Sequence, residues 1–232
     1  MYTSTKHIFF DLDNTLWDFE NNSKKTIFEL IQEFKLSEKC RCLPAAFYKT
    51  YLLVNQDLWA LYRKNAITKE QLRSSRFTNT MLYFGHDDQN LGLLLEENYI
   101  LRSPQQKGLV EGTIEILEYL STKYQLHIIT NGFKEIQHIK IGNCNLKKYF
   151  KNIFISEEIG CNKPNPGIFE FALNHLSALK SETIMIGDDW DADILGAQQF
   201  GMSSIYFSRK PNDIENKLVP QINNLLQLKE ML

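Results

Sequence analysis

Two carboxylates two residues apart follow the first apolar segment of the chain, in Phe10-Asp11-Leu12-Asp13-Asn14-Thr15. In a loop that leaves a buried strand, Asp11 and Asp13 can reach the same small volume. One carboxylate of such a pair can attack an electrophile while the other moves protons. Asp-x-Asp is also common in solvated turns, so the pair by itself indicates either a reactive site or an exposed loop.

Three further polar segments could take part in the same chemistry. Thr130-Asn131-Gly132 offers a hydroxyl, an amide and a flexible backbone, which can bind phosphate oxygens without adding charge. Lys163 lies in a proline-stiffened loop, and Gly187 is followed by a carboxylate cluster, Asp188 to Asp193. Each segment also has a structural explanation: a hydrogen bond at a strand end, a surface charge, or an acidic first turn of a helix.

The elements that must position these residues are five short apolar segments, which predict buried strands. They are residues Lys6–Phe10, Leu126–Thr130, Ile153–Ser156, Thr183–Gly187 and Ser203–Phe207. Near-continuous apolar runs are typical of parallel strands covered on both faces. Apolar residues at helical spacing lie between the later segments, namely Ile114, Leu117 and Leu120, then Phe169, Ala172, Leu173 and Leu176. Alternating strands and helices predict a doubly wound α/β sheet, whose carboxyl edge would gather all four polar segments.

A long segment of helical pattern interrupts this alternation between Asn21 and Lys107. Two apolar stripes run through it, Ile27, Leu30, Ile31 and Phe34, then Tyr51, Val54, Leu58 and Leu61. Thr68 followed by Gln71 predicts a helix start with a capping box. The segment is too long for one crossover. We therefore predict a core domain of residues 1–18 and 108–232, with a helical cap of residues 19–107 over the carboxyl end of the sheet.

The composition restricts the partners of the protein. The 232 residues carry a formal charge of −2, so no global basic field favours a nucleic acid polymer, and an anionic substrate needs a local site. No apolar run reaches the roughly 18–20 residues that cross a bilayer. Ile8-Phe9-Phe10 ends at Asp11 and is too short for a secretory signal, so we expect a cytoplasmic protein without a membrane partner. The four cysteines show no disulfide or zinc spacing and are expected to be reduced: Cys40, Cys42, Cys144 and Cys161.

As a set, the polar segments resemble motifs I to IV of the haloacid dehalogenase superfamily. The matching residues are Asp11-Leu12-Asp13-Asn14-Thr15, Thr130, Lys163, and Gly187-Asp188-Asp189 with Asp193. They occur in the family's order, with the insert between motifs I and II, and the resemblance spans almost the whole chain. It implies a Rossmannoid core of strand order 5-4-1-2-3 and a helical cap of the C1 type. Asn14 stands where the family often has glycine, and Asn131 follows Thr130 in place of a serine.

The resemblance implies a Mg²⁺-dependent phosphatase in which Asp11 attacks phosphorus and forms an aspartyl-phosphate. Asp13 would protonate the leaving oxygen and then activate water. Dehalogenases of the superfamily lack this second aspartate, so its presence argues against halide chemistry. The resemblance assigns Mg²⁺ to the Asp11 carboxylate, the backbone carbonyl of Asp13 and the Asp188 carboxylate, with Asp189 and Asp193 orienting these ligands.

The resemblance also implies how the phosphoryl group is held. Thr130 would bind a phosphate oxygen, helped by backbone N–H groups near Leu12 and Asn131. Lys163 would neutralise the nucleophile and the phosphate, which supplies locally the positive charge that the chain lacks overall.

Asp11 to Glu20 resembles the opening of the pyrimidine 5′-nucleotidase subfamily, which implies a small phosphorylated metabolite, a nucleoside monophosphate, as substrate. Trp17 and Phe19 could meet a base or could pack at the junction of core and cap, and Trp190 has the same two explanations. Four cap residues could face a cleft or lie on solvated helix faces: Trp59, Arg63, Arg73 and Arg76. No cap residue is assigned to the site.

Other functions are compatible with the same residues. A phosphosugar phosphatase, or a phosphoglucomutase-like phosphotransferase of the same fold, would use the same aspartates. A non-catalytic binding protein on a phosphatase scaffold is a further alternative, although the nucleophile, the acid and the metal ligands of the family are all present. A monomer and a homodimer are equally compatible with the sequence.

Overall fold

The computed structural model describes residues 2–209 and 219–232. The chain divides into two compact units, a core unit of Met1–Phe19 with Lys107–Leu232 and a helical unit of Glu20–Gln106. No helix within the described residues is long and apolar enough to span a bilayer. The four cysteines are free.

The core unit is built on a six-stranded sheet whose paired strands are all parallel, in the order β3-β2-β1-β4-β5-β6. The strands are β1 (His7–Phe10), β2 (Gln125–Thr130), β3 (Phe150–Ile155), β4 (Thr183–Gly187), β5 (Ser203–Phe207) and β6 (Gln221–Ile222). The predicted strand order 5-4-1-2-3 is confirmed, with β6 added at one edge. β3 begins earlier than predicted, at Phe150, because the polar Lys151 and Asn152 interrupt its apolar pattern.

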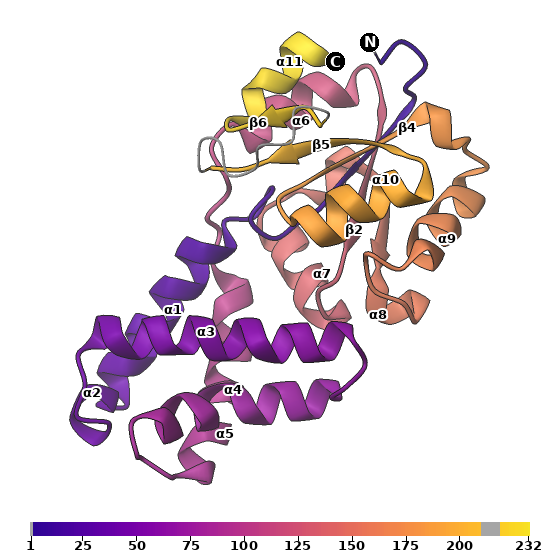
Figure 1. Ribbon diagram of the computed structural model, residues 1–232. Coiled ribbons are helices and arrows are strands. Elements are labelled where there is room, and N and C mark those ends of the chain that lie inside the picture. Colours follow the sequence, from indigo (N-terminus) through magenta and orange to yellow (C-terminus); the bar gives the residue numbers. More distant parts are fainter. Residues whose placement is uncertain (1, 210–218) are drawn as a thin grey trace. The chain divides into compact units, whose positions relative to one another are not determined.

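Helices cover both faces of this sheet (Figure 1). Side chains of a strand alternate between faces, so Phe10 and Phe9 enter two different clusters. The Phe10 cluster packs against α6 (Thr113–Ser121), α7 (Lys134–Asn143) and α11 (Leu228–Met231), whereas the Phe9 cluster packs against α9 (Pro166–Leu176) and α10 (Gly196–Phe200). The doubly wound α/β fold predicted from the sequence is therefore confirmed.

Two helical stripes were predicted for the core unit, and they differ in outcome. In α9, Phe169, Ala172 and Leu173 are buried as predicted. In α6 the prediction for Ile114 is wrong, because Ile116, Leu117 and Leu120 form the buried face and Ile114 is 38% exposed. The remaining short elements of the core unit are α8 (Ser156–Ile159), η2 (Lys147–Tyr149), η3 (Lys180–Glu182), η4 (Trp190–Leu195) and η5 (Leu225–Gln227).

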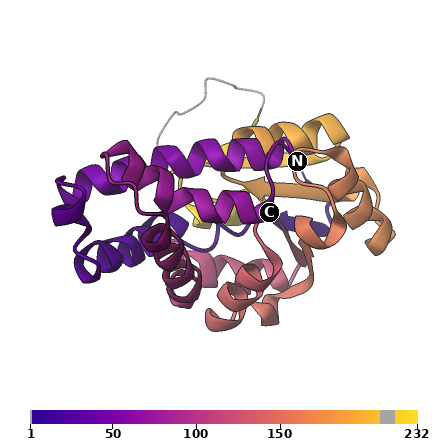
Figure 2. The same ribbon diagram turned by 90° about the horizontal axis from the view of Figure 1, so that it is seen from below.

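The helical unit contains no strand among residues 20–106. Its helices are α1 (Phe19–Glu33), α2 (Leu36–Lys39), α3 (Pro44–Arg63), α4 (Lys69–Tyr83), α5 (Gln89–Arg102) and η1 (Ser103–Gln105). The two long helices α3 and α4 lie side by side (Figures 1 and 2). The predicted capping box of α4 is present, since Thr68 Oγ1 accepts from Gln71 N and Thr68 N donates to Gln71 Oε1.

The two stripes predicted for this unit are partly correct. Ile27, Leu30 and Ile31 of α1 are buried. The stripe of α3 is wrong at Leu61, which is 42% exposed. The buried face of α3 passes through Phe47, Tyr51, Asn55 and Leu58, and Leu61 lies at the edge of that face.

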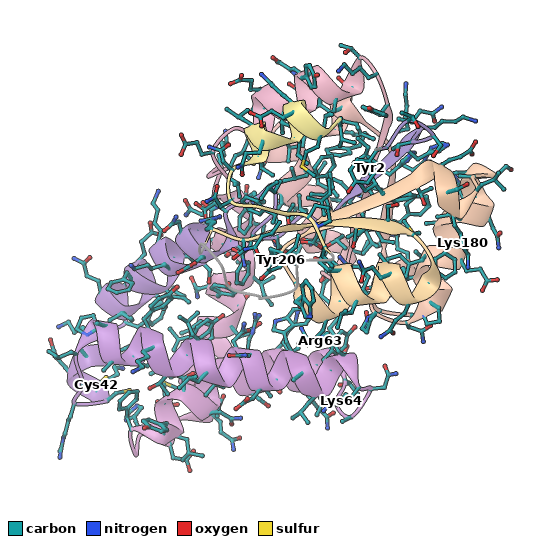
Figure 3. The ribbon with its side chains drawn as sticks, turned by 45° about the horizontal axis from the view of Figure 1, so that its top comes forward. Tyr2, Cys42, Arg63, Lys64, Lys180 and Tyr206 are labelled. Atoms are coloured by element: carbon teal, nitrogen blue, oxygen red, sulfur yellow. The ribbon has the colours of Figure 1, made fainter. Side chains whose placement is uncertain are left out.

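Arg76 of α4 is a buried structural residue of the helical unit. Its guanidinium pairs with the Glu96 carboxylate and lies 5.0 Å from the centre of the Tyr99 ring. This contact accounts for its burial, because a buried charge needs a partner that satisfies it. Both interpretations of Arg76, as a residue that faces a cleft and as one on a solvated helix face, are therefore wrong. Arg63 lies exposed at the C-terminal end of α3 (Figure 3).

Two histidines are buried next to each other in the central sheet. His7 Nδ1 of β1 lies 3.2 Å from His127 Nε2 of β2, and the His127 ring also packs against Phe9. Burial, with further contributions from His7 and His175, lowers the pKa of His127 to about 4. The ring is thus held neutral inside the sheet, and charging it opposes folding.

Acid is expected to destabilise the protein through His127. An unfolded histidine has a pKa of about 6.5, so the stability contributed by the neutral ring is present above that pH and is lost as the pH falls toward about 4. The contribution of His127 to the unfolding free energy should fall by about 2–3 kcal/mol over this range, measured by urea denaturation of wild type beside the variants. His127→Phe should remove most of that loss, whereas His138→Gln, on the exposed surface of α7, should keep it. Equal acid sensitivity in His127→Phe would contradict the role given to His127.

Candidate active site

Three neighbouring strands end at one edge of the sheet and carry the predicted site residues. Asp11 follows β1, Thr130 ends β2 and Asp188 follows β4. β1 pairs with both β2 and β4, so these ends are adjacent. Since the carboxyl edge of an open parallel sheet is where ligands bind, the topology brings the predicted residues to a functional position.

Lys163 lies at the centre of this cluster although it comes from the loop before α9. Its Nζ donates to Asp11 Oδ1 at 2.6 Å, to Asp193 Oδ1 at 2.5 Å and to the Ile129 carbonyl at 2.8 Å. The side chain is 1% exposed. Asn131 holds the loop in place, because its amide donates to the Lys163 carbonyl at 2.9 Å and accepts from the Lys163 N–H at 2.8 Å. Lys163 is therefore a fixed internal cation and not a surface charge.

Three carboxylates are close enough to hold one metal ion. Oxygens of Asp11, Asp188 and Asp193 lie within 4.8 Å of one another. With Lys163 the set carries a formal charge of three negatives and one positive, which is −2. Oxygen donors are the ligands that Mg²⁺ prefers, and a divalent cation would cancel this charge. The donor set thus fits Mg²⁺.

The electrostatics of the cluster agree with a need for added positive charge. Burial raises the pKa of Asp11 to about 7, helped by the charges of Asp193 and Asp13 and opposed by Lys163. Burial and the neighbouring Asp11 and Asp193 raise the pKa of Asp188 well above its ordinary value. Burial would lower the pKa of Lys163, but Asp11 and Asp193 raise it, so the ammonium stays charged. The carboxylates are thus crowded and under-compensated when no cation is bound.

Both oxygens of Asp193 are used inside the protein. Oδ1 accepts from Lys163, and Oδ2 accepts from the Asp189 N–H at 3.1 Å. Asp189 itself caps the following turn, since its Oδ1 accepts from the N–H groups of Asp191 and Ala192. Asp188 has one oxygen engaged, by the Thr15 hydroxyl at 3.0 Å. Asp188 is therefore better placed than Asp193 to offer an oxygen outward.

Gly187 is required by the position of Asp193. A Cβ atom on Gly187 would lie 2.1 Å from Asp193 Oδ2, which is far inside van der Waals contact. Gly187→Ala should therefore displace the Asp193 carboxylate and weaken its contact with Lys163. We expect a loss of about 1–3 kcal/mol in unfolding free energy, measured by denaturant titration.

Gly142→Ala is the matched control for this substitution. Gly142 lies in α7, where an added Cβ meets nothing within 4 Å. This change should be neutral or stabilising by up to about 1 kcal/mol, because alanine favours a helix. If Gly187→Ala were as stable as Gly142→Ala, the crowding at Asp193 would not constrain position 187.

Asp13 is held by two donors of α7 that were not predicted. Lys140 Nζ donates to both carboxylate oxygens, at 2.7 and 2.9 Å, and Gln137 Nε2 donates to Oδ2 at 3.0 Å. Asn14, where the family often has glycine, adopts a left-handed backbone with a φ of 61°. Asparagine tolerates this region better than most residues, so the turn after Asp13 keeps the conformation that glycine would favour.

The Thr130 hydroxyl is oriented by its neighbours. Its oxygen accepts from Gln137 Nε2 at 2.7 Å and from Gly132 N at 3.4 Å. With both lone pairs engaged, its O–H is left to donate, and within the described residues it has no acceptor. The backbone N–H groups of Leu12 and Asn131 likewise donate no hydrogen bond within the described part of the chain.

Sequence reasoning assigned no role to Gln137, Lys140 or Thr15. A signal for the first two existed, because Phe133, Gln137 and Lys140 recur at helical spacing and are all buried. Polar residues at positions where a helix buries apolar ones indicate a buried polar partner. Thr15 lies in the segment that carries the family resemblance, but its role was not predicted, since a hydroxyl in a loop has many local uses.

Three tryptophans that were considered for contact with the substrate pack against other side chains: Trp17, Trp59 and Trp190. Trp17 is fully buried in the Phe10 cluster, which excludes a base-facing role for its ring in this structure. Trp190 packs edge-on against Tyr206 of β5, which is labelled in Figure 3, with ring centres 5.4 Å apart. In the helical unit, Trp59 packs edge-on against Tyr62.

Comparisons with known proteins show the family and the fold of this chain. The family described as haloacid dehalogenase-like hydrolase matches residues 5–201. The pyrimidine 5′-nucleotidase PynA of Streptococcus pneumoniae is 30% identical over 91% of this chain and 86% of its own length. The pyrimidine 5′-nucleotidase YjjG of Escherichia coli is 28% identical over 97% of this chain and 96% of its own. The magnesium-bound crystal structure of the HAD-hydrolase YfnB from Bacillus subtilis shares the fold, with a TM-score of 0.85 and 24% identity over 98% of both chains.

Proposed function

Since the chain belongs to the haloacid dehalogenase-like hydrolase family, we propose that it is a Mg²⁺-dependent phosphomonoester hydrolase that acts through an aspartyl-phosphate. The observation that carries this proposal is the buried contact of Lys163 with Asp11 and Asp193, beside Asp188. A nucleophile held by a fixed ammonium group, next to further carboxylates, suits attack on an anionic phosphoryl group.

The Asp11 and Asp188 carboxylates and the backbone carbonyl of Asp13 are the groups that would hold Mg²⁺, with Asp189 and Asp193 orienting them. When bound, the cation offsets the charge that develops on the phosphoryl oxygens and the repulsion between phosphate and nucleophile. The engagement of both Asp193 oxygens supports its role as an orienting residue.

The first half of the reaction transfers the phosphoryl group to Asp11. An Asp11 oxygen attacks phosphorus in line with the ester oxygen, and the new P–O bond forms as the ester P–O bond breaks. Asp13 gives its proton to the departing oxygen, which leaves as a hydroxyl group. Thr130 and the N–H groups of Leu12 and Asn131 hold the transferred phosphoryl oxygens, and Lys163 balances their charge.

The second half returns Asp11 to its starting state. Asp13, now a carboxylate, takes a proton from a water molecule as that water attacks the phosphorus of the aspartyl-phosphate. The bond between phosphorus and the Asp11 oxygen breaks, and inorganic phosphate leaves. One residue thus acts as acid and then as base, which is why a second aspartate beside the nucleophile supports hydrolysis.

The proposed substrate is a small phosphorylated metabolite, namely a pyrimidine nucleoside 5′-monophosphate. Its support is the likeness over almost the whole chain to PynA and YjjG, both named pyrimidine 5′-nucleotidases. The residues of the core unit serve the phosphoryl group that all such esters share. Other residues must therefore select the nucleoside part of the substrate, and no residue is assigned to that role.

The experiment that tests this function measures phosphate release from nucleoside monophosphates and sugar phosphates, with Mg²⁺ and with EDTA. Mg²⁺-dependent release led by pyrimidine monophosphates is expected. Release led by sugar phosphates would keep the mechanism and overturn the substrate. Isomerisation of a sugar phosphate without release would indicate a phosphotransferase, and binding without turnover of any ester would indicate a non-catalytic protein.

A further inference from the structure

We propose that Gln137 and Lys140 are positioning residues for the reaction, which clamp the Asp13 carboxylate by both oxygens and aim the Thr130 hydroxyl at the phosphoryl group. The inference rests on the proposed function, because it assigns these side chains to the acid–base and phosphate-binding steps of the same site. Both side chains belong to α7, the helix that follows Thr130. Neither side chain has a role in the acid–base or phosphate-binding steps described above.

Lys140 is a buried lysine whose only hydrogen-bond acceptors among the described residues are the two oxygens of Asp13. It is 4% exposed, and its Nζ lies 4.3 Å from the centre of the Trp17 ring and 5.5 Å from that of Phe19. Both rings lie within the distance at which an aromatic face attracts a cation. The position of Asp13 is therefore set by a cation that is itself held in place.

Gln137 joins the acid–base residue to the phosphate-binding residue. Its Nε2 donates to Asp13 Oδ2 at 3.0 Å and to Thr130 Oγ1 at 2.7 Å, and the side chain is fully buried. Because Thr130 accepts this hydrogen bond, its own O–H remains free to donate to a phosphate oxygen. One amide group thus fixes the direction of both functional groups.

Gly132 provides an independent reason to assign a role to Gln137. A Cβ atom at Gly132 would lie 2.2 Å from Gln137 Nε2 and 2.3 Å from its Cδ. The backbone of Gly132 does not have a positive φ, so the glycine serves close approach and not a left-handed turn. The loop after β2 is therefore shaped to admit the Gln137 amide between Thr130 and Asp13.

Lys140→Met tests the clamp, because methionine keeps the apolar stem against Trp17 and removes the ammonium group. For a nucleoside monophosphate, whose leaving oxygen needs a proton, we expect kcat to fall about 10²-fold. For 4-nitrophenyl phosphate, whose leaving group departs as a stable anion, formation of the aspartyl-phosphate should stay fast and its hydrolysis should slow. The variant should then show a burst of nitrophenolate of up to one equivalent, with phosphate trapped on Asp11.

The matched control is Lys134→Met, the same substitution on the exposed side of the same helix. Lys134 pairs with Glu158 and has a side chain that is 57% exposed, so this variant should behave as wild type. Lys140→Arg keeps the charge and should recover part of the lost kcat. Gly132→Ala, whose added Cβ atom would meet the Gln137 side chain, should reproduce the kcat loss and should also raise KM through Thr130.

A double-mutant cycle separates positioning from a general structural effect. If Lys140 acts through Asp13, Lys140→Met should have no further effect on nitrophenolate release in an Asp13→Asn background. Additive losses, or equal slowing of both esters without accumulated aspartyl-phosphate, would overturn the proposal. So would an unchanged kcat in Lys140→Met. Absence of phosphate release from wild type would instead refute the proposed function, which keeps the two failures distinguishable.

Discussion

Asp11→Asn is expected to lower the rate of phosphate release by at least about 10⁴-fold, because an amide oxygen cannot form the acyl-phosphate. The measurement is phosphate release under saturating substrate and Mg²⁺, with the variant purified under the same conditions as wild type. Near wild-type turnover would exclude Asp11 as the nucleophile.

The same variant should be more stable than wild type when no divalent cation is present. Burial raises the pKa of Asp11 to about 7, so the ionised carboxyl opposes folding and stability is lost as the pH rises from about 4 through 7. The neutral amide removes this cost, and Lys163 keeps Asp193 as its partner. Melting in EDTA should therefore show a higher Tm for Asp11→Asn, with a larger gain at about pH 8 than at about pH 5.

The melting temperature shows whether Asp11→Asn fails to release phosphate only because it is misfolded. A variant that is inactive because it is misfolded would melt at a lower temperature than wild type. An inactive variant with a raised Tm has lost chemistry and not structure, as is common where a site holds crowded like charges for function. A lowered Tm at both pH values would contradict the electrostatic description of the cluster.

Lys163→Met should have the largest effect on stability. The substitution leaves Asp11 and Asp193 buried without their ammonium partner, and breaking a buried ion pair from one side costs about 3–5 kcal/mol. Without that charge the pKa values of both carboxyls rise further, so the loss should grow as the pH rises. Urea denaturation at about pH 5 and about pH 8 checks this expectation, with the greater loss at the higher pH.

Lys134→Met is again the control, because that lysine is exposed and its surface ion pair contributes little to stability. A loss in Lys163→Met that is as small as in this control would mean that Lys163 does not compensate the cluster. Double replacement of Lys163 with Met and Asp193 with Asn should recover part of the stability, since it removes one of the two stranded carboxylates.

The sequence was sufficient for the strands whose apolar runs are unbroken. β4 and β5 have the bounds that the pattern predicts, since both lie in the interior of the sheet and are buried along most of their length. The sequence was insufficient where the burial of a side chain depends on neighbours distant in the chain. Ile114 and Leu61 are apolar and at helical spacing, yet both are exposed, because the helices present slightly different faces to their partners.

The residues of the candidate site also differ in whether the sequence alone predicts them. Asp11, Thr130 and Asp188 were predictable because each follows a strand, and strand ends in a parallel sheet share one edge. Their types and order also carry the family resemblance, and the family match over residues 5–201 confirms it.

Only the tertiary structure decided how charges are shared among these residues. Nothing in the spacing of Lys163 and Asp193 shows that one ammonium group serves both Asp193 and Asp11, or that Lys140 and Gln137 close on Asp13. Sequence patterns indicate which face of an element is apolar. They do not show that a polar residue is buried, because its burial depends on a partner elsewhere in the chain. The sequence thus determined the fold, the family and the candidate nucleophile. Packing determined which polar side chains complete one another, because hydrogen bonds and ion pairs depend on distances between segments far apart in the chain.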